Sequence, residues 1–475
     1  MSGFDPSQLV ELTKKKYKIL TLCDHPLSPS GVGVQANFLM RGLLDTGKYT
    51  VRSLGGAMKH SNYNIVQPHP EMIIKPVDNF GTKDDIRHLL LTERPDAIFI
   101  FTDPRQFYWV WEMADEIRQV CPIVYWHVWD NDPYPAFNDI WYQETDLLNC
   151  LSYKTYEMLK EHFPEKTNYV PHTFPKSVYY PMPKESIRQH SLNSFGDRAD
   201  WFKILWVNRN ATRKVPADVI ASFNDFLNAL EAKHGHRKAL LVMHTDPLDM
   251  EGPNLLEVQS LYKLHNNLIF STEKLEFDKM NVLHNMCDTL VNIAYAEGFG
   301  LSTLIQMMVG KPIVALKTGG MTRQVVDYRD GSENGVAIEP IARKLVGSQV
   351  VPYIHEDIVS HAQVVDAFMK IYEMTSEQKQ VMSQKVLEYC EHEFSYPNMI
   401  KTWDETLEKT ILDFKAKKQS SDRKNYTVTK IKNFQAPIEK QPVQNAQVDA
   451  TIVNMPVDIT KYILNNVKIT KGAMA

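Results

Sequence analysis

Short apolar runs alternate with amphipathic helical patterns along most of this chain, and the alternation occurs in two series. We interpret the proline-rich passage between them, residues 171–199, as irregular. Apolar strands that alternate with helices predict a parallel sheet covered on both faces. Two such series predict two doubly wound α/β domains. The runs that resemble strands are 18–24, 97–101, 123–127 and 147–152 in the first series, and 204–207, 239–244, 268–270, 290–293 and 313–316 in the second.

The chain length supports this division, because a single hydrophobic core stops growing at about 250–300 residues and the chain has 475. We place an N-terminal Rossmann-like domain at 1–195 and a C-terminal one at 196–395. Residues 357–412 have a helical pattern almost throughout, and we expect a basic, largely disordered tail over 419–475.

Charge is distributed unevenly. The net charge is −4, yet residues 414–475 carry eleven Lys and Arg against four Asp and Glu. The remaining body is acidic, which gives no support for binding along a nucleic-acid duplex, because that requires clustered cations. The tail is either a solvated extension or a contact for an anionic partner.

Cysteine usage and hydropathy indicate a cytoplasmic protein. The five cysteines, Cys23, Cys121, Cys150, Cys287 and Cys390, are far apart, and no pair has metal-ligand spacing. We therefore expect free thiols in a reducing compartment. No apolar run reaches the roughly 18–20 residues of a membrane span, and no signal-peptide stretch follows the lysines at 14–16. We expect no transmembrane segment.

The most informative segment is EGFGLSTLIQMMVGKP, Glu297–Pro312. A predicted strand ends, an acidic glycine-rich turn follows, and a helix begins near Leu301. Glycines at a helix N-terminus let a phosphate or a sugar approach the unpaired backbone N–H groups. Glu297 is placed to accept hydrogen bonds from sugar hydroxyls. The alternative is a tight turn with a solvated acid.

This segment resembles the donor-binding motif of the retaining GT-B glycosyltransferases of the glycogen-synthase and mannosyltransferase group, glycosyltransferase family four (glycosyl transferases group 1). Other segments occur in the family's order, and the resemblance covers roughly residues 18–410. They are PSGVGVQ (29–35), YWHVWD (125–130), VNRNATRK (207–214) and KTGGMTRQVVDYRDGSENGVAI (317–338).

The resemblance implies a GT-B fold, with an acceptor-side N-terminal domain and a nucleotide-sugar-binding C-terminal domain that face a cleft. It also implies that a helix at 396–418 crosses back to the N-terminal domain. The implied activity is that of a metal-independent hexosyl- or pentosyltransferase, which moves a sugar from a nucleotide diphosphate sugar with retention of configuration. The implied leaving group deprotonates the acceptor, and no cofactor is required beyond this co-substrate.

The family motifs also imply site residues. Arg209 and Lys214, which we expect at the surface of the cleft, would neutralise the donor diphosphate as the leaving group gains charge. Gly31 and Gly33 would bring the first loop against the same phosphates. His127 and Glu297 would be catalytic, with His127 bound to the donor sugar. The turn would complete the donor site with Gly298, Phe299, Gly300, Leu301 and Ser302, although Phe299 has the alternative of a core residue.

The chain departs from the family at two positions. The family usually carries a second Glu eight residues after the first, where it holds the ribose hydroxyls, and this position is Ile305. The Glu usually found after the Gly-Gly turn is replaced near Gln324. Ile305 either faces the ribose or points into the helix–sheet core. These changes fit altered donor binding, and they also fit a non-catalytic sugar or nucleotide binder on the same fold.

Two rival motifs are weaker. Residues 31–36 match GxGxxA, a dinucleotide fingerprint, but a Pro- and Ser-rich loop separates them from the strand, and no acid ends the strand at 49–54. The Asp130–Asn131–Asp132 segment has a DxD spacing that suits a hard cation, but two duplicated α/β halves favour a turn before Pro133.

The acceptor stays open. Some aromatic residues near the cleft would stack on a sugar or base, and most would be core: Trp109, Trp111, Trp126, Trp129, Tyr134 and Phe137.

Overall fold

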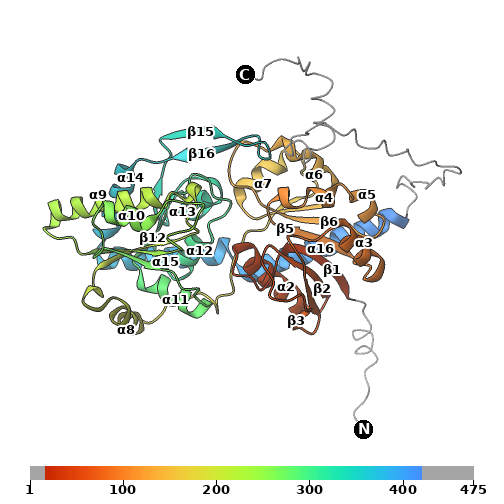
Figure 1. Ribbon diagram of the computed structural model, residues 1–475, viewed down its shortest axis with the longest axis horizontal. Coiled ribbons are helices and arrows are strands. Elements are labelled where there is room, and N and C mark those ends of the chain that lie inside the picture. Colours follow the sequence, from red (N-terminus) through yellow and green to blue (C-terminus); the bar gives the residue numbers. More distant parts are fainter. Residues whose placement is uncertain (1–15, 420–475) are drawn as a thin grey trace, which may run out of the picture. The chain divides into compact units, whose positions relative to one another are not determined.

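The computed structural model describes residues 16–419, which contain two large, mostly parallel sheets flanked by helices (Figure 1). The predicted α/β class is confirmed. The predicted basic tail lies outside the described residues from 420 onwards, as do two of the N-terminal lysines. The domain limits predicted at 195 and 395 stay predictions as exact boundaries.

The first sheet has eight strands in the order β3-β4-β2-β1-β5-β6-β7-β8. Every neighbouring pair is parallel except β3 and β4, which are antiparallel. All residues of β5 and β6 are buried, because helices cover both faces of these central strands. The strands are β1 (Tyr17–Asp24), β2 (Tyr49–Gly56), β3 (Val66–His69), β4 (Met72–Pro76), β5 (Ala97–Phe101), β6 (Ile123–His127), β7 (Leu147–Cys150) and β8 (Thr167–Tyr169).

The second sheet has six strands, all parallel, in the order β11-β10-β9-β12-β13-β14. The chain crosses from one edge back to the middle between β11 and β12, which creates a switch point beside β9 where ligands commonly bind. The strands are β9 (Phe202–Val207), β10 (Ala239–His244), β11 (Leu268–Ser271), β12 (Thr289–Asn292), β13 (Ile313–Leu316) and β14 (Gly335–Ile338).

Helices cover both sheets. The first group is α2 (Gly31–Asp45), α3 (Lys83–Thr92), α4 (Tyr108–Trp111), α5 (Ala114–Ile117), α6 (Asp139–Glu144) and α7 (Tyr153–Lys160). The second is α8 (Lys184–Phe195), α9 (Pro216–His234), α10 (Leu255–Leu261), α11 (Phe277–Met286), α12 (Leu301–Met308), α13 (Thr322–Val325), α14 (His361–Tyr372), α15 (Ser376–Glu393) and α16 (Tyr396–Gln419).

The structure refines the predicted pattern in three places. Residues 107–120, within the predicted alternation of strands and helices, form two short helices, α4 and α5. The passage predicted to be irregular contains α8, which begins after Pro183 and ends at Gly196, whose φ is 58°. A short antiparallel hairpin follows β14 and was not predicted. Its strands are β15 (Ala342–Val346) and β16 (Ile354–Ile358).

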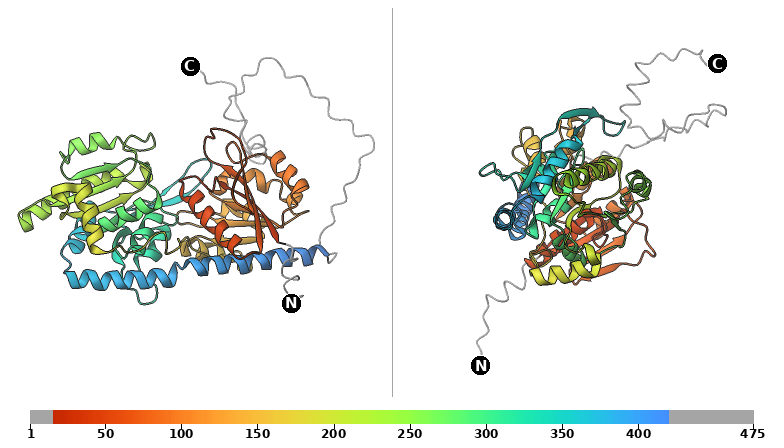
Figure 2. Two further views of the ribbon diagram at one scale, coloured as in Figure 1. Left: turned by 90° about the horizontal axis from the view of Figure 1, so that it is seen from below. Right: turned by 90° about the vertical axis from the view of Figure 1, so that its left-hand side faces the viewer.

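The long helix α16 packs against the first sheet, as its contacts show and as can be followed in blue in Figure 2. Trp403 is fully buried, and its ring centroid lies 5.2 Å from that of Phe99 and 5.5 Å from that of Trp126. Lys48 also pairs with Asp404 at 2.8 Å. The C-terminal helix therefore returns from the second sheet to the first.

Arg323 of α13 provides a second link between the halves. Its guanidinium lies 3.9 Å from the ring centroid of Tyr153 of α7 and donates to Glu393 at 2.8 Å. Tyr169 at the end of β8 donates to the same carboxylate at 2.8 Å. These contacts hold α7 and β8 of the first half against α13 and α15 of the second.

Candidate functional site

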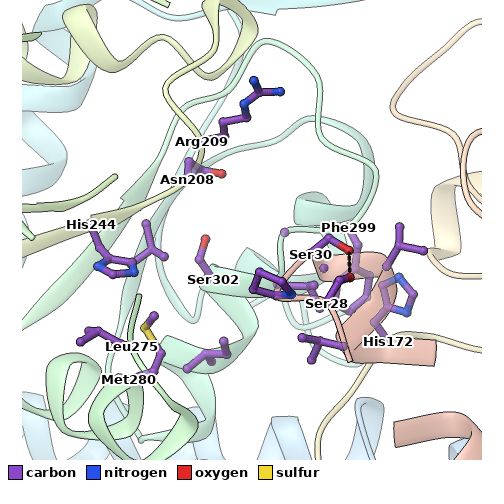
Figure 3. A pocket seen from close by; sticks show the side chains of 18 of the residues that line it. Ser28, Ser30, His172, Asn208, Arg209, His244, Leu275, Met280, Phe299 and Ser302 are labelled. Carbon is purple, nitrogen blue, oxygen red and sulfur yellow. Dashed lines mark hydrogen bonds between the residues drawn. The ribbon is translucent and has the colours of Figure 1, made fainter. Parts of the chain in front are cut away.

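A cavity of about 930 Å³ lies at the carboxyl ends of strands from both sheets (Figure 3). Its second-sheet wall follows β9, β10, β11 and β12, and includes Asn208, His244 and Ser302. Its first-sheet wall follows β1, β6 and β7, and includes Ser28 and Ser30. The carboxyl ends of parallel strands are the usual ligand site of open α/β sheets, so this cavity is the candidate site.

Two glycine turns pack directly on one another beside the cavity. Gly300 precedes α12 with a φ of 90°, which favours glycine. The backbone N–H of Gly320 donates to the carbonyl of Glu297 at 2.9 Å. A Cβ added to Gly320 would stand 2.7 Å from the Cα of Phe299, and one added to Gly298 would stand 2.8 Å from the Asp130 carboxylate. The close packing explains why both motifs need glycine.

Lys214 and Glu297 form an ion pair at this turn. Burial lowers the pKa of Lys214, and the nearby Glu297 carboxylate partly opposes that shift. Burial raises the pKa of Glu297, but the charges of Lys214 and Arg213 outweigh burial and leave it below its ordinary value. Glu297 is therefore ionised at neutral pH. Lys214 lines the cavity, but it is buried rather than at the surface of the cleft as predicted.

Arg209 and Arg213 line the same cavity. The Arg209 guanidinium is exposed, and it pairs with Asp249 at 2.7 Å and with Glu251 at 2.9 Å. Arg213 donates to the carbonyl of Ala296 at 2.9 Å. The sequence prediction missed Arg213, although it directly precedes Lys214. The loop after β9 therefore supplies three cations to the cavity.

The predicted glycine loop contributes one of its two glycines to the cavity. Gly31 lines the wall, and a Cβ there would stand 2.9 Å from Leu301 of α12. Gly33 does not line it. A Cβ on Gly33 would approach the carbonyl of His25 to 2.6 Å, and its N–H donates to the N-cap side chain of Ser30 at 3.0 Å. The structure thus gives Gly33 a packing role at the start of α2.

His127 does not line the cavity. Its side chain is fully buried, its Nε2 bonds the hydroxyl of Tyr142 at 2.8 Å, and burial lowers its pKa to about 3. The predicted catalytic role of His127 therefore has no geometric support. The reason is that Tyr142 of the later helix α6 covers the ring at the end of β6.

His172, which the sequence prediction missed, does line the cavity. Its ring lies 5.1 Å from that of Phe299, between centroids. Burial lowers its pKa to about 3, so the ring is neutral at neutral pH. Its Nδ1 has no hydrogen-bond partner among residues 16–419. The residue lies in the proline-rich passage after β8, where no pattern marked it.

The turn residues predicted for the donor site all line the cavity: Glu297, Gly298, Phe299, Gly300, Leu301 and Ser302. Phe299 also belongs to the hydrophobic core, as the alternative interpretation predicted. Ile305 likewise lines the cavity while it is 7% exposed and packed in the core. Gln324 is buried and donates to the carbonyl of Phe299 at 2.7 Å, and its Oε1 accepts from Thr303 at 2.5 Å. Gln324 therefore braces the turn.

The DxD segment is tied into the protein. The Asn131 amide donates to Thr318 at 3.0 Å and to Asp357 at 2.8 Å, and Asp132 pairs with Lys154 at 2.8 Å. Over residues 16–419, no group of His, Cys, Asp or Glu is arranged to hold a metal ion.

No helix in residues 16–419 has the length and apolar character of a membrane crossing. The six aromatic residues singled out from the sequence do not line the cavity.

Comparisons with known proteins agree with this geometry. Residues 193–346 match the model of the family described as "Glycosyl transferases group 1". This range contains the loop of three cations, the glycine-rich turn and the Gly-Gly turn. No curated protein matches the chain in sequence.

Solved structures share the fold at low sequence identity. The complex of HepE from Anabaena with UDP and glucose is 16% identical, with a TM-score of 0.62, and the match covers 82% of this chain and 99% of that one. A sucrose-phosphate synthase from Thermosynechococcus elongatus is 12% identical, with a TM-score of 0.64, and the match covers 84% and 100%. The catalytic domain of starch synthase IV from Arabidopsis thaliana, bound to ADP and acarbose, is 12% identical, with a TM-score of 0.57 and coverage of 84% and 99%.

The likeness extends over both sheets, whereas the family match is confined to the part of the chain that forms the second sheet. The chain is therefore a GT-B-fold protein whose residues 193–346 match the glycosyl transferases group 1 family.

Proposed function

We propose that this protein transfers a sugar from a nucleotide diphosphate sugar to an acceptor hydroxyl, with retention of configuration. The family match at residues 193–346 supports sugar transfer. The fold shared with HepE, whose solved complex contains UDP and glucose, supports a nucleotide sugar as the donor. The acceptor class stays open.

The observation that carries the proposal is the set of charges beside the glycine turn. Arg209, Arg213 and Lys214 come from one loop and line one cavity, and Glu297 pairs with Lys214 there. A nucleoside diphosphate gains negative charge as it departs, so preorganised cations stabilise the transition state more than the ground state. Arg213 and Lys214 would bind the diphosphate, while Arg209 would leave its surface carboxylates to bind it at the rim.

The reaction proceeds on one face of the sugar. The bond between the anomeric carbon and the phosphate oxygen breaks, and its electron pair leaves with the nucleoside diphosphate. The acceptor oxygen forms the new bond to the anomeric carbon from the same side, and its proton passes to an oxygen of the departing phosphate. The protein binds, orients and neutralises charge, and it supplies no covalent nucleophile.

Two buried side chains would hold the donor sugar. The ionised Glu297 accepts hydrogen bonds from sugar hydroxyls while Lys214 balances its charge. The neutral ring of His172 offers its unpartnered Nδ1 to another sugar hydroxyl or to the acceptor. In this proposal His172 takes the place that the sequence prediction gave to His127.

The proposed reaction uses no resident cofactor and no divalent ion. In this proposal the three cations that line the cavity neutralise the diphosphate in place of a metal. Turnover should therefore persist in excess EDTA, and loss of turnover that Mg²⁺ or Mn²⁺ restores would contradict this part of the proposal.

One observation favours a second candidate, a non-catalytic nucleotide or sugar binder. Ile305 lines the cavity where the family usually has a carboxylate, and it cannot accept a hydrogen bond from a ribose. Such a loss permits binding without efficient turnover.

A donor panel separates the candidates. UDP-glucose, ADP-glucose and GDP-mannose are incubated with the protein, and released nucleoside diphosphate is measured beside a thermal shift with each nucleoside diphosphate. Release above the rate of a Glu297→Gln control supports the transferase. A thermal shift without release of nucleoside diphosphate from any donor supports the binder. The absence of both signals would contradict both candidate functions.

A further inference from the structure

A second cavity of about 490 Å³ lies at the opposite end of the second sheet. Its lining includes Phe202 and Lys203 at the start of β9, and the residues that come shortly before β10, β12 and β13, namely Lys238, Asp288 and Lys311. The cavity at the carboxyl ends contains Val207 from the other end of β9. At about 3.3 Å per residue, the six-residue strand separates the two cavities along its length.

The second cavity concentrates positive charge in a chain whose net charge is −4. Two carboxylates line it, Asp200 and Asp288. The cationic side chains that line it are Lys184, Arg188, Lys203, Lys238, Lys311 and Lys379, and His236 lies with them. Like charges gathered around one concave surface repel each other, and a bound anion relieves that repulsion.

The cations are not balanced within the protein. Lys203 is buried, and its ammonium donates to the carbonyls of Ala199 at 2.5 Å and Trp201 at 2.9 Å. The carboxylate of Asp288 accepts the backbone N–H of Lys203 at 2.8 Å. The five other cationic side chains form no salt bridge with any residue in 16–419. Both the lysine and the aspartate nearest the sheet are thus held by backbone groups, while the outer cations have no carboxylate partner in that range, although the Lys379 ammonium lies 5.9 Å from the ring centroid of Phe202.

We propose that this second cavity is a binding site for a phosphorylated small molecule. Lysines and arginines on several elements, α8, the strand starts and α15, converge on the cavity and would surround one phosphate group. No family feature described above involves these residues, and the site is separate from the proposed donor pocket.

The shape favours a small ligand over a polymer. A volume of about 490 Å³ is within the range of small-molecule pockets, roughly 300–1,000 Å³. Partly buried aromatic residues, Trp201 and Tyr372, line the same cavity and offer an apolar wall to the organic part of the ligand. A polyanion would instead need cations that continue as a stripe along the surface.

Two elements connect this cavity to the donor pocket. Helix α11 has Phe277 and Met280 in the first cavity and Met286 in the second. Helix α12 begins with Leu301 in the first cavity, and Lys311, which follows its end, lines the second. A ligand that orders the second cavity therefore contacts the far ends of both helices that shape the donor pocket.

The test uses the full chain and two probes, inorganic phosphate and ribose 5-phosphate, with binding measured by calorimetry. The Lys311→Gln, Lys379→Gln double variant removes two cations of the site. The charge-matched control is Lys401→Gln with Lys409→Gln, two lysines of α16 with 72% and 75% of their side chains exposed. We expect the site variant to lose at least tenfold in affinity for the probes, and the control to bind as the wild type does.

Further arms separate the alternatives. A probe that binds in the donor pocket would lose affinity in Arg209→Ala, whereas the second cavity predicts no change in that variant. Tighter binding of ribose 5-phosphate than of phosphate identifies an organic phosphate as the ligand of the cavity. Equal binding of the two probes identifies free phosphate as the ligand. Both outcomes support the site. Equal affinity in the site and control variants would contradict it. The absence of binding of both probes would also contradict the site. Binding of an RNA oligonucleotide without binding of either probe would contradict it as well.

Discussion

Lys214 and Glu297 form a nearly buried ion pair, with 10% and 13% of their side chains exposed. The lysine comes from the loop after β9 and the glutamate from the turn before α12, so the pair joins two elements that are 83 residues apart in sequence. The same two side chains line the proposed donor pocket. The pair therefore links two distant elements and, in the proposed function, also contributes to the donor site.

Lys214→Met should destabilise the protein and weaken nucleotide binding together. The substitution leaves Glu297 buried without its main partner, and breaking a buried pair costs about 3–5 kcal/mol, reduced here because Arg213 also attracts Glu297. Urea unfolding should show a loss of about 2–4 kcal/mol. The double variant Lys214→Met, Glu297→Gln should recover part of it, and no recovery would show that the two charges are not coupled.

Arg213→Ala and Arg209→Ala should leave the protein folded and weaken its affinity for a nucleoside diphosphate. A hydrogen bond to a charged group contributes about 1.5–3 kcal/mol, so each loss should be roughly tenfold or more. Arg213 should have the larger effect, because its carboxylate partner Asp130 lies 3.6 Å away, whereas Arg209 has to leave two closer carboxylates. Arg237→Ala, which removes an arginine paired with Glu231, is the control. Unchanged affinity in both site variants would overturn the donor-site assignment.

Ile305→Glu tests the missing carboxylate. The position lines the cavity and also packs in the core, so the new side chain reaches solvent at some cost in packing. We expect tighter nucleoside diphosphate binding, by about tenfold, and a loss of about 1–3 kcal/mol in stability. Ile305→Gln separates charge from hydrogen bonding. A collapsed melting temperature with no gain in affinity would mean that the side chain turns into the core.

Stability should fall as the pH drops below about 6.5. Burial lowers the pKa of His127, His172 and His284 to about 3, so these rings are neutral when folded and take up protons on unfolding. The stability that these neutral rings contribute is complete above the pKa of histidine in the unfolded state, near 6.5, and is lost as the pH falls toward 3. Together the three rings change the free energy of unfolding by up to about 4 kcal/mol per pH unit. Urea unfolding between pH 7.5 and 5.5 measures the slope, and His284→Gln should reduce it by about a third. A slope that corresponds to uptake of less than one proton on unfolding would contradict this account.

The sequence predicted the parts of the site that lie in local motifs. The glycine turn at 297–302 could be located because a strand, glycines and a helix follow one another within a few residues. Arg209 and Lys214 were implied by the resemblance of residues 207–214 to a family motif in which an arginine and a lysine follow a strand. The backbone of these residues is placed by the strand that directly precedes it, so the local pattern was sufficient to put them at the carboxyl edge of the sheet.

Other features depend on distant contacts that no local pattern encodes. His127 ends β6, yet Tyr142 of a later helix covers it, whereas His172 reaches the cavity from a passage without a pattern. The burial of Lys214 depends on Glu297, which is far away in sequence. The β15–β16 hairpin was missed because its first strand is mostly polar and exposed, so it shows no apolar alternation.

The most direct test of the proposed function is the anomeric form of the sugar that the protein releases. An α-linked nucleotide sugar that supports release is incubated with the protein in water, and the first free sugar is followed by proton NMR before mutarotation. We predict that the α anomer appears first, and that Glu297→Gln slows its release at least a hundredfold while the protein remains folded. First appearance of the β anomer, or equal release by the Glu297→Gln variant, would contradict a retaining transfer at this site.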